Sequence, residues 1–261
     1  LPFTIGLAAM APEEWIEVDT ALPAYLDEKE RLQTLHPDKV FVEESDSHAS
    51  QQEVVDSLAG YLPATYPNTY RRIDQSIEII PAARLIKLNQ AGTPPLLLAS
   101  KLVQEDLVIM RKGENGWRLA AASLSFPSSW SLLDKFGKPM HEIHAPVPGF
   151  GAGTRNAGLI ERMFDNLQPA NPVKRFNWSI YSDGELYHPP ASGERNANPD
   201  HAFIRVERQT LRKMPISRDI LFTIRICLDP LSTLAAQPNA ARLSHSLADQ
   251  LWIPKAEAGY V

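Results

Sequence analysis

The sequence contains one cysteine, Cys227, among its 261 residues. A single thiol excludes an intrachain disulfide, a zinc site with two or more cysteines, a four-cysteine iron–sulfur cluster and a C-x-x-C-H haem attachment. If the chain holds a metal, histidine and carboxylate side chains must therefore bind it. Because Cys227 lies in an apolar segment, we interpret it as a packed small hydrophobe rather than a nucleophile.

The chain also lacks basic runs and long apolar runs. Its net charge is -5 and no run of Lys and Arg exceeds two residues, so the basic stripe that a phosphate backbone requires is missing. No apolar stretch approaches the roughly 18 residues of a membrane-spanning helix, and residues 1–11 are too short for a secretory signal and lack its charged start. We therefore expect a cytoplasmic protein that binds neither nucleic acid nor a membrane.

Proline is abundant, with 22 residues, and it divides the N-terminal region. Apolar residues at helical spacing predict a helix over residues 13–35, with a break or kink at Pro23. The S-x-x-E spacing of Ser50-Gln51-Gln52-Glu53 predicts a capping box that begins a second helix, which Pro63 and Pro67 would end. Both apolar stripes indicate packing against a core.

After Ile77 the apolar residues alternate, which indicates strands. We predict strands over residues 77–80, 96–98, 106–112, 117–124, 175–181, 202–212 and 220–228. Hairpin turns are expected at 113–116 and 214–219, and helices at 126–130, after a Thr154 cap, and at 239–251. Antiparallel strands interrupted by helices indicate an α+β fold with one central sheet. Residues 1–75 would form a helical wrapper on a core of residues 76–261, together one structural domain.

Two histidines three residues apart, His141 and His144, are candidate metal ligands. Their spacing departs by one residue from the H-E-x-x-H pattern of zinc peptidases. Pro139 and Pro146 bracket them and exclude a long helix, so His144 is expected at a helix end or in a loop. Two alternatives remain open for His144: a lone axial ligand with a stiff backbone, or an ordinary surface or core histidine.

A glycine-rich segment, residues 149–156, precedes one predicted helix. It does not fit a dinucleotide-binding loop, because Asn156 stands where the third glycine belongs and no strand comes before it. A helix N-terminus attracts carboxylates and phosphates, and Arg155 in the first turn would add a positive charge. An anion site and a plain capped helix start are both consistent with this spacing.

Charged residues lie on the last two predicted strands. In residues 220–228 the apolar Ile220, Phe222, Ile224 and Ile226 take one face, which puts Arg225 on the other between Leu221 and Cys227. Such an arginine is either a buried functional cation or a structural partner of Glu207 on the neighbouring strand. The spacing leaves both interpretations open.

Four blocks together resemble the haem-dependent oxidative N-demethylase family. They are Gln104-Glu105-Asp106-Leu107, the segment from Phe126-Pro127-Ser128 with Trp130 to His144-Ala145-Pro146-Val147-Pro148, Arg175-Phe176-Asn177-Trp178, and the segment from Arg205-Val206-Glu207-Arg208 to Thr223-Ile224-Arg225. The resemblance spans roughly residues 5–250. It implies a PAS-like fold whose central antiparallel sheet and flanking helices enclose non-covalent b-type haem.

The resemblance also implies an activity and partners. In the enzyme type that this chain resembles, the haem subunit oxidises dimethylamine with O2 and formaldehyde is released. Electrons arrive through FMN and a 2Fe-2S cluster on a separate reductase chain, and a folate-binding subunit takes the formaldehyde. A chain with one cysteine and no nucleotide loop is consistent with this division of labour.

The matched blocks suggest roles for particular residues. His144 is the expected axial ligand of the haem iron, with His188 in reserve. Arg225 and Glu207 are expected as a distal pair, since a cation can stabilise negative charge developing on iron-bound dioxygen and a carboxylate can hold an ammonium substrate.

Three further residues are expected to bind the cofactor itself. Arg155 and Arg208 would pair with haem propionates through charge-assisted hydrogen bonds. Asn177, in the fourth block, is the other cofactor-binding candidate.

Two other functions compete with the N-demethylase. One is a non-catalytic haem-based gas or redox sensor, or a haem-binding module of the PAS type, which would need neither a reductase nor a substrate-binding anion. The other is a non-haem metal enzyme that uses His141 and His144 with a carboxylate.

Overall fold

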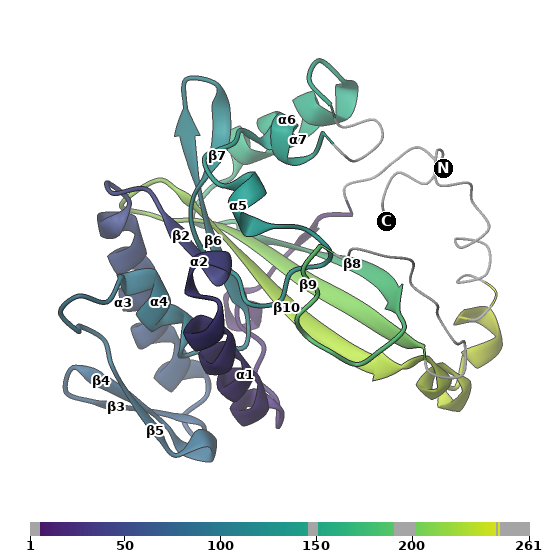
Figure 1. The fold of residues 1–261 in the computed structure, drawn as a ribbon, viewed down its shortest axis with the longest axis horizontal. Coiled ribbons are helices and arrows are strands. Elements are labelled where there is room, and N and C mark those ends of the chain that lie inside the picture. Colours follow the sequence, from purple (N-terminus) through teal and green to yellow (C-terminus); the bar gives the residue numbers. More distant parts are fainter. Residues whose placement is uncertain (1–5, 146–150, 191–201, 244, 246–261) are drawn as a thin grey trace.

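A seven-stranded antiparallel sheet forms the centre of the protein (Figure 1). The structure, a computed structural model, describes residues 6–145, 151–190, 202–243 and 245. The strand order is β1-β8-β9-β10-β6-β7-β2. The strands are β1 (Ala8–Ala9), β2 (Phe41–Glu43), β6 (Asp106–Gly113), β7 (Gly116–Ser123), β8 (Val173–Tyr181), β9 (Phe203–Lys213) and β10 (Ile220–Pro230).

A smaller sheet and several helices surround the central one. The small sheet contains β3 (Tyr70–Ile73), β4 (Ser76–Ile79) and β5 (Arg84–Lys87). The α-helices are α1 (Leu22–Leu35), α2 (Pro37–Val40), α3 (His48–Thr65), α4 (Pro95–Ser100), α5 (Leu132–Lys135), α6 (Met140–Ile143) and α7 (Arg155–Asn166). Short 3-10 helices occupy Pro12–Glu14, Ile80–Ala82 and Leu231–Ala236. The predicted PAS-like α+β architecture is confirmed.

The two faces of the central sheet are covered by different parts of the chain. On one face, here called the α3 face, Leu107, Ile109 and Leu221 pack with α3 and the N-terminal segment. On the opposite face, the α7 face, Val108 and Met110 pack with α5, α6 and α7. Alternating side chains along each strand produce this division, as the apolar pattern predicts.

Beyond the middle of the sheet, β10 loses one of its neighbours. It pairs with β6 only from Ile220 to Ile224, because β6 begins at Asp106. Past that point α1 replaces the strand: Tyr25 donates its hydroxyl to the Ile226 carbonyl (2.9 Å), and Lys29 donates to the carbonyls of Val103 and Glu105. Helix α1 therefore satisfies backbone groups that no strand reaches.

Several predicted elements are confirmed. Strands β6 and β7 form the hairpin around residues 113–116, and Gly116 has the positive φ of 99° that such a turn requires. Thr154 caps α7 by accepting a hydrogen bond from the Ala157 amide. Strands β9 and β10 pair along their whole length across the predicted turn at 214–219.

Other predictions about local structure are wrong. Residues 96–98 lie in α4 rather than in a strand, because Pro95 at the first helical position favours a helix start. Helix α3 begins at His48, one residue after Ser47, so Ser50 is inside the helix and forms no capping box. The Ser50 hydroxyl instead donates to Asp219 (2.6 Å), a tertiary contact.

The prediction for the prolines holds in part. The predicted helix over residues 13–35 is present only as α1 from Leu22 onward, so the expected break falls at Pro23, which lies in the first turn, where its missing N–H would have no partner. Pro63 is inside α3, which ends only at Thr65. Residues 126–130 are not helical, and the next helix is α5. The predicted helix at 239–251 lies largely outside the described residues.

In both sheets, strands from the predicted N-terminal wrapper (residues 1–75) pair with strands from the predicted core (residues 76–261). Strand β2 pairs with β7, and β3 pairs with β4.

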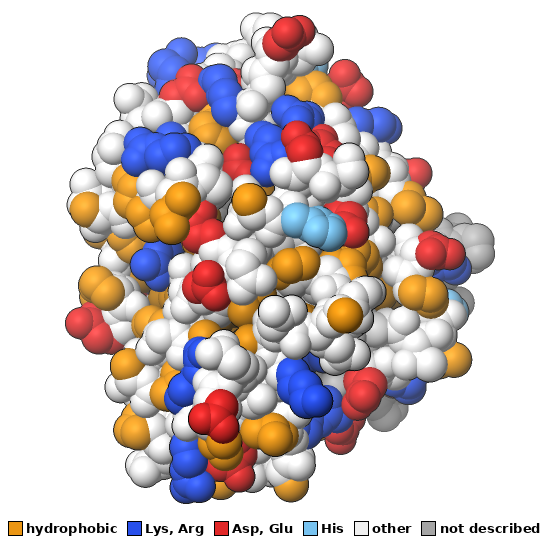
Figure 2. Space-filling model, turned by 90° about the vertical axis from the view of Figure 1, so that its left-hand side faces the viewer, with side chains coloured by type: hydrophobic (Ala, Val, Ile, Leu, Met, Phe, Trp, Pro, Cys, Tyr) orange, Lys and Arg blue, Asp and Glu red, His pale blue; other side chains and the backbone are white. Residues whose placement is uncertain are grey.

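Figure 2 shows the side of the molecule on the left of Figure 1, where Lys and Arg side chains are interspersed with Asp and Glu. Within the described ranges, no helix has the length and apolar character needed to cross a bilayer.

Candidate functional site

The register between β9 and β10 determines which charged residues can meet. Arg225 lies directly opposite Arg208, and Ile226 lies opposite Glu207. Directly opposed residues of antiparallel strands share a face, and successive residues alternate. Arg225 and Arg208 therefore lie on the α3 face, whereas Glu207 lies on the α7 face. The structure does not bring Arg225 and Glu207 together, either as a distal pair or as an ion pair.

On the α3 face the two arginines bind the N-terminal segment. The Arg208 guanidinium donates to the backbone carbonyls of Glu14 and Trp15 and pairs with Glu17 at 3.4 Å. The Arg225 guanidinium donates to Asp19 (2.7 Å) and lies 4.2 Å from the centroid of the Tyr25 ring. Both cations therefore act as structural partners of residues 14–25. The structure gives no support to the expectation that Arg208 meets a propionate beside His144.

On the α7 face, β8 and β9 bring three polar side chains side by side. Asn177 lies directly opposite Glu207, and Arg175 lies two residues before Asn177 on the same face. Arg175 Nε and Asn177 Oδ1 are buried and have no hydrogen-bond partner among the described residues. Such orphaned atoms are uncommon in native proteins and indicate a missing partner. Burial lowers the pKa of the Arg175 guanidinium, and the negative charge of Glu207 opposes that shift.

The Glu207 carboxylate is held at both oxygens. It is 8% exposed. The Ser128 hydroxyl donates to Oε1, and the Gln209 amide donates to Oε2 at 2.8 Å. These hydrogen bonds fix the carboxylate at the surface of the sheet, on the same side as Arg175.

His144 lies at the C-terminal end of α6, as the flanking prolines predict. Its Nδ1 is 3.0 Å from the Met140 carbonyl oxygen. A carbonyl only accepts, so Nδ1 carries the proton and Nε2 carries the lone pair that a metal requires. Burial lowers the pKa of the imidazole, and the positive charges of Lys135 and Arg175 lower it further. The ring is therefore neutral at pH 7. It lies close enough to Arg175 for the charge of that residue to affect its pKa.

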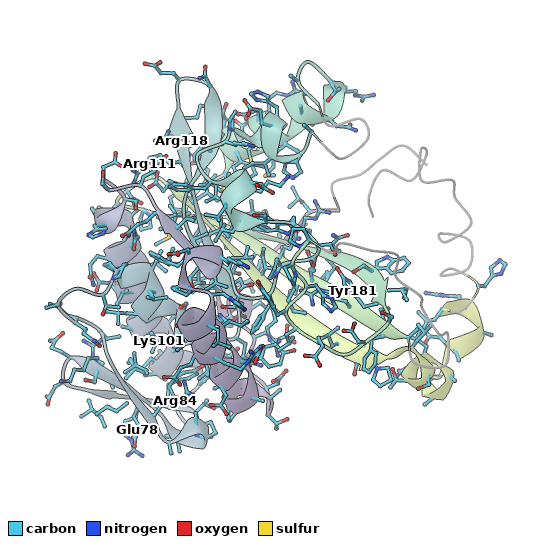
Figure 3. The ribbon with its side chains drawn as sticks, in the orientation of Figure 1. Glu78, Arg84, Lys101, Arg111, Arg118 and Tyr181 are labelled. Atoms are coloured by element: carbon cyan, nitrogen blue, oxygen red, sulfur yellow. The ribbon has the colours of Figure 1, made fainter. Side chains whose placement is uncertain are left out.

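His188, the reserve ligand, lies at another part of the α7 face. Its Nε2 is 3.1 Å from Asp183 Oδ1, and its ring centroid is 4.2 Å from that of Tyr181. Tyr181 is the last residue of β8 (Figure 3). The backbone of His188 accepts a hydrogen bond from the Ser129 amide at 2.8 Å. The backbone of His188 is thus hydrogen-bonded to the turn that contains Ser128.

The remaining candidates are His141 and Arg155. The His141 imidazole is partly exposed and lies 3.9 Å from Glu142. Arg155 is exposed in the first turn of α7. In the part of the chain that the structure describes, no three His, Cys, Asp or Glu side chains cluster as a metal site would require. The non-haem site with His141, His144 and a carboxylate is therefore not formed by these residues.

Taken together, the α7 face offers the groups that a haem needs. A neutral imidazole with a fixed tautomer can bind iron, and a half-buried guanidinium without a partner can bind a carboxylate of the cofactor. Half-buried apolar residues pack against the hydrophobic cluster of this face and could cover a planar ring: Trp130, Phe136, Ile143, Met163, Leu186, Phe222 and Leu228. The orphaned atoms of Arg175 and Asn177 fit a group that is bound from outside the chain.

The fold and this face define a PAS-like α+β protein with a candidate cofactor site on one side of its sheet. Residues 6–252 match the family described as haem-dependent oxidative N-demethylase, alpha subunit-like. The match covers nearly the whole chain, and the protein belongs to this family. Dependence on haem and an oxidative N-demethylase lineage, as one subunit among others, follow from that membership.

Sequence reasoning assigned no role to Ser128, to Arg175, or to Arg205, whose Nε donates to the Ser128 hydroxyl at 3.1 Å. All three stand in the blocks that carry the resemblance. The alternation along β8 puts Arg175 on the face of Asn177, and this signal could have identified it. The contact between Ser128 and Glu207 joins residues 79 positions apart, and no local pattern predicts it.

Proposed function

We propose that this chain is the haem-binding subunit of an enzyme that oxidatively demethylates a small secondary amine resembling dimethylamine. The overall reaction consumes the amine, O2, two electrons and two protons, and yields the demethylated amine, formaldehyde and water. The electrons come from a separate reductase chain carrying FMN and a 2Fe-2S cluster, and a folate-binding subunit takes the formaldehyde. The whole assembly is cytoplasmic. The observation that carries this proposal is the fixed Glu207 carboxylate on the same sheet face as Arg175 and His144.

Each residue of the face has a defined task in this proposal. When bound, b-type haem supplies the activation of O2 and the oxidation of an N-methyl carbon. His144 would hold the iron through Nε2, and Arg175 and Asn177 would bind the polar periphery of the cofactor. Arg155, exposed at the start of α7, is the second cation available to a propionate.

Glu207 selects the substrate by charge. A secondary amine is protonated at pH 7, and a buried carboxylate binds an ammonium group through a charge-assisted hydrogen bond. Because Ser128 and Gln209 hold the two carboxylate oxygens, Glu207 keeps one orientation and aligns the methyl group with the face of the sheet. Arg175 balances the charge of Glu207 before the amine enters.

A haem titration tests the cofactor part of the proposal. Apo protein mixed with haem should develop a Soret band, and His144→Ala should change the ferric spectrum. His141→Ala, from the same short helix, is the matched control and should leave the spectrum unchanged. A change with His188→Ala alone would transfer the ligand role to His188. The absence of any Soret band would contradict the haem-binding function.

An amine titration tests the catalytic part. Dimethylamine should perturb the haem spectrum of the wild type, and formaldehyde should form when a reductase and NADPH are added. Glu207→Gln should shift both responses to about 100-fold higher amine concentration while the protein still binds haem. A wild type that binds haem but responds to no small amine would support a haem-based sensor instead.

A further inference from the structure

The turn that follows β7 is held by an unusual set of buried charges. The Asp106 carboxylate accepts hydrogen bonds from the Ser125 and Phe126 amides, both at 2.8 Å. Lys29 from α1 lies 3.8 Å from the same carboxylate, with both side chains almost completely buried. Charges are placed in the core only when paired, so these groups fix the backbone where the turn begins.

Arg205 fixes the other end of the turn. Its guanidinium is fully buried and donates to the Phe126 carbonyl (2.7 Å), the Leu186 carbonyl (3.2 Å) and the Ser128 hydroxyl (3.1 Å). It also lies 5.4 Å from the centroid of the Tyr181 ring. All three donor nitrogens of Arg205 therefore engage the turn or the segment beside it.

This arrangement determines the direction of the hydrogen bond between Ser128 and Glu207. Arg205 Nε can only donate, so the Ser128 oxygen must accept from it. The single proton of the hydroxyl is then directed at Glu207 Oε1. The positive charge of Arg205 polarises the hydroxyl, which strengthens its hydrogen bond to the carboxylate.

We propose that Ser128 is a positioning residue for amine binding: polarised by Arg205, it holds Glu207 as an oriented carboxylate that receives the ammonium group of the substrate. This inference rests on the proposed function for its substrate, and on the structure for the hydrogen bond. In this role Ser128 acts through Glu207, to which it donates its proton. Because only the hydroxyl of Ser128 donates to Glu207, we expect any residue with a hydroxyl at this position to support amine binding.

A binding experiment with four proteins tests the amine part. Ser128→Ala should raise the Kd for dimethylamine, read from the haem spectrum, by about 10- to 100-fold, the range for losing a hydrogen bond to a charged group. Ser128→Thr keeps the hydroxyl and should restore most of the affinity. Ser125→Ala is the matched control, because its buried hydroxyl has no hydrogen-bond partner among the described residues. Cyanide affinity should be the same in all four.

A second measurement tests the hydrogen bond without haem or amine. In urea unfolding of the apo protein, Ser128→Ala and Glu207→Gln should be non-additive, with the double variant about 3-fold more favourable in its folding equilibrium than the sum of the single effects. Additive effects would overturn the inference. Non-additivity combined with unchanged amine affinity in Ser128→Ala would overturn the positioning role alone. If the effects are non-additive but the wild type binds no amine, the proposed function is contradicted, and the amine role of Ser128 with it. The hydrogen bond between Ser128 and Glu207 would still be supported.

Discussion

The two faces of the central sheet differ in one cation: Arg175 on the α7 face lacks the partners that Arg208 and Arg225 have on the α3 face and that Arg205 has on the α7 face. On the α3 face, Arg208 and Arg225 are bonded to the N-terminal segment by several groups each. On the α7 face, Arg175 has no hydrogen bond or ion pair with any described residue, and its Nε is buried. Arg225 also has an unbonded Nε, but its other two nitrogens are engaged. Arg208 and Arg225 thus contribute to the fold through partners in their own chain, whereas Arg175 has a charge that a ligand could bind.

This contrast distinguishes structural from functional charge better than burial does. Arg225 is more deeply buried than Arg175, yet it has Asp19 and Tyr25 as partners. A charge whose partners come from its own chain contributes to folding, whereas a half-buried charge without them costs free energy until a ligand arrives. We therefore expect substitutions of Arg208 and Arg225 to change stability, and substitution of Arg175 to change binding.

The largest effect is expected from Arg225→Ala. Its loss leaves Asp19 without its cation and Tyr25 without its stacking partner, which should lower the free energy of unfolding by about 3 kcal/mol. This is the low end for a broken buried pair, because Asp19 is half exposed. Urea unfolding measures it, with the exposed Arg71→Ala as control. A stable Arg225→Ala variant that has lost its amine response would restore the distal role expected from the sequence.

The next largest effect is expected from Glu207→Gln, on the opposite face. The amide removes the charge but keeps the shape, so the affinity for dimethylamine should fall about 100-fold, or about 2.7 kcal/mol. The free energy of unfolding should change by less than about 1 kcal/mol. Spectral titration and urea unfolding of the same preparation measure the two quantities. Equal amine affinity in the variant would exclude Glu207 as the ammonium site.

A smaller and more direct comparison joins Arg175→Met with Arg208→Met. Arg175→Met should weaken haem binding about 10-fold and leave apo stability unchanged or slightly higher, because the half-buried guanidinium has no partner to lose. Arg208→Met should do the reverse and destabilise the fold by about 2 kcal/mol without changing haem affinity. Haem titration and urea unfolding of each variant measure the two quantities. Equal changes in haem affinity and in the free energy of unfolding would show that Arg175 and Arg208 do not differ in role.

The smallest effect concerns pH. Burial lowers the pKa of His144 in the folded chain, so below the ordinary value of about 6.5 the unfolded chain binds more protons and stability falls as the pH falls. The apo His144→Ala variant should lose about 1 kcal/mol less than the wild type between pH 7 and pH 5. Urea unfolding at steps of pH measures this, with His141→Ala for comparison. A parallel pH dependence in the wild type and His144→Ala would contradict a neutral, half-buried His144.

Much of the fold follows from local patterns in the sequence. Alternation along residues 220–228 predicts the two faces of β10 correctly, and the Gly113-Glu114-Asn115-Gly116 turn predicts the first hairpin. Among the predicted strands the exception is residues 96–98 in α4, where three leucines in a row fit a buried strand or a buried helix equally well. The preceding prolines decide in favour of the helix.

The site was harder to predict, because it depends on the pairing register. The turn after Met214 closes through a hydrogen bond from the Met214 amide to the Asp219 carbonyl (2.8 Å), and this sets Arg225 opposite Arg208. A slip of one residue would have put Arg225 opposite Glu207 and made them neighbours. Sequence alone identifies both strands but does not determine which residues face each other.

The early end of the pairing between β6 and β10 has a consequence for solubility. Beyond Ile224 the outer edge of β10 would expose unpaired backbone groups, which invite a strand from another molecule to add on. Tyr25 and Arg225 both occupy the carbonyl of Ile226, and the body of α1 blocks the approach. Helix α1 therefore protects the sheet against edge-to-edge aggregation, so a chain that lost this helix would be prone to self-association even where its cofactor face was intact.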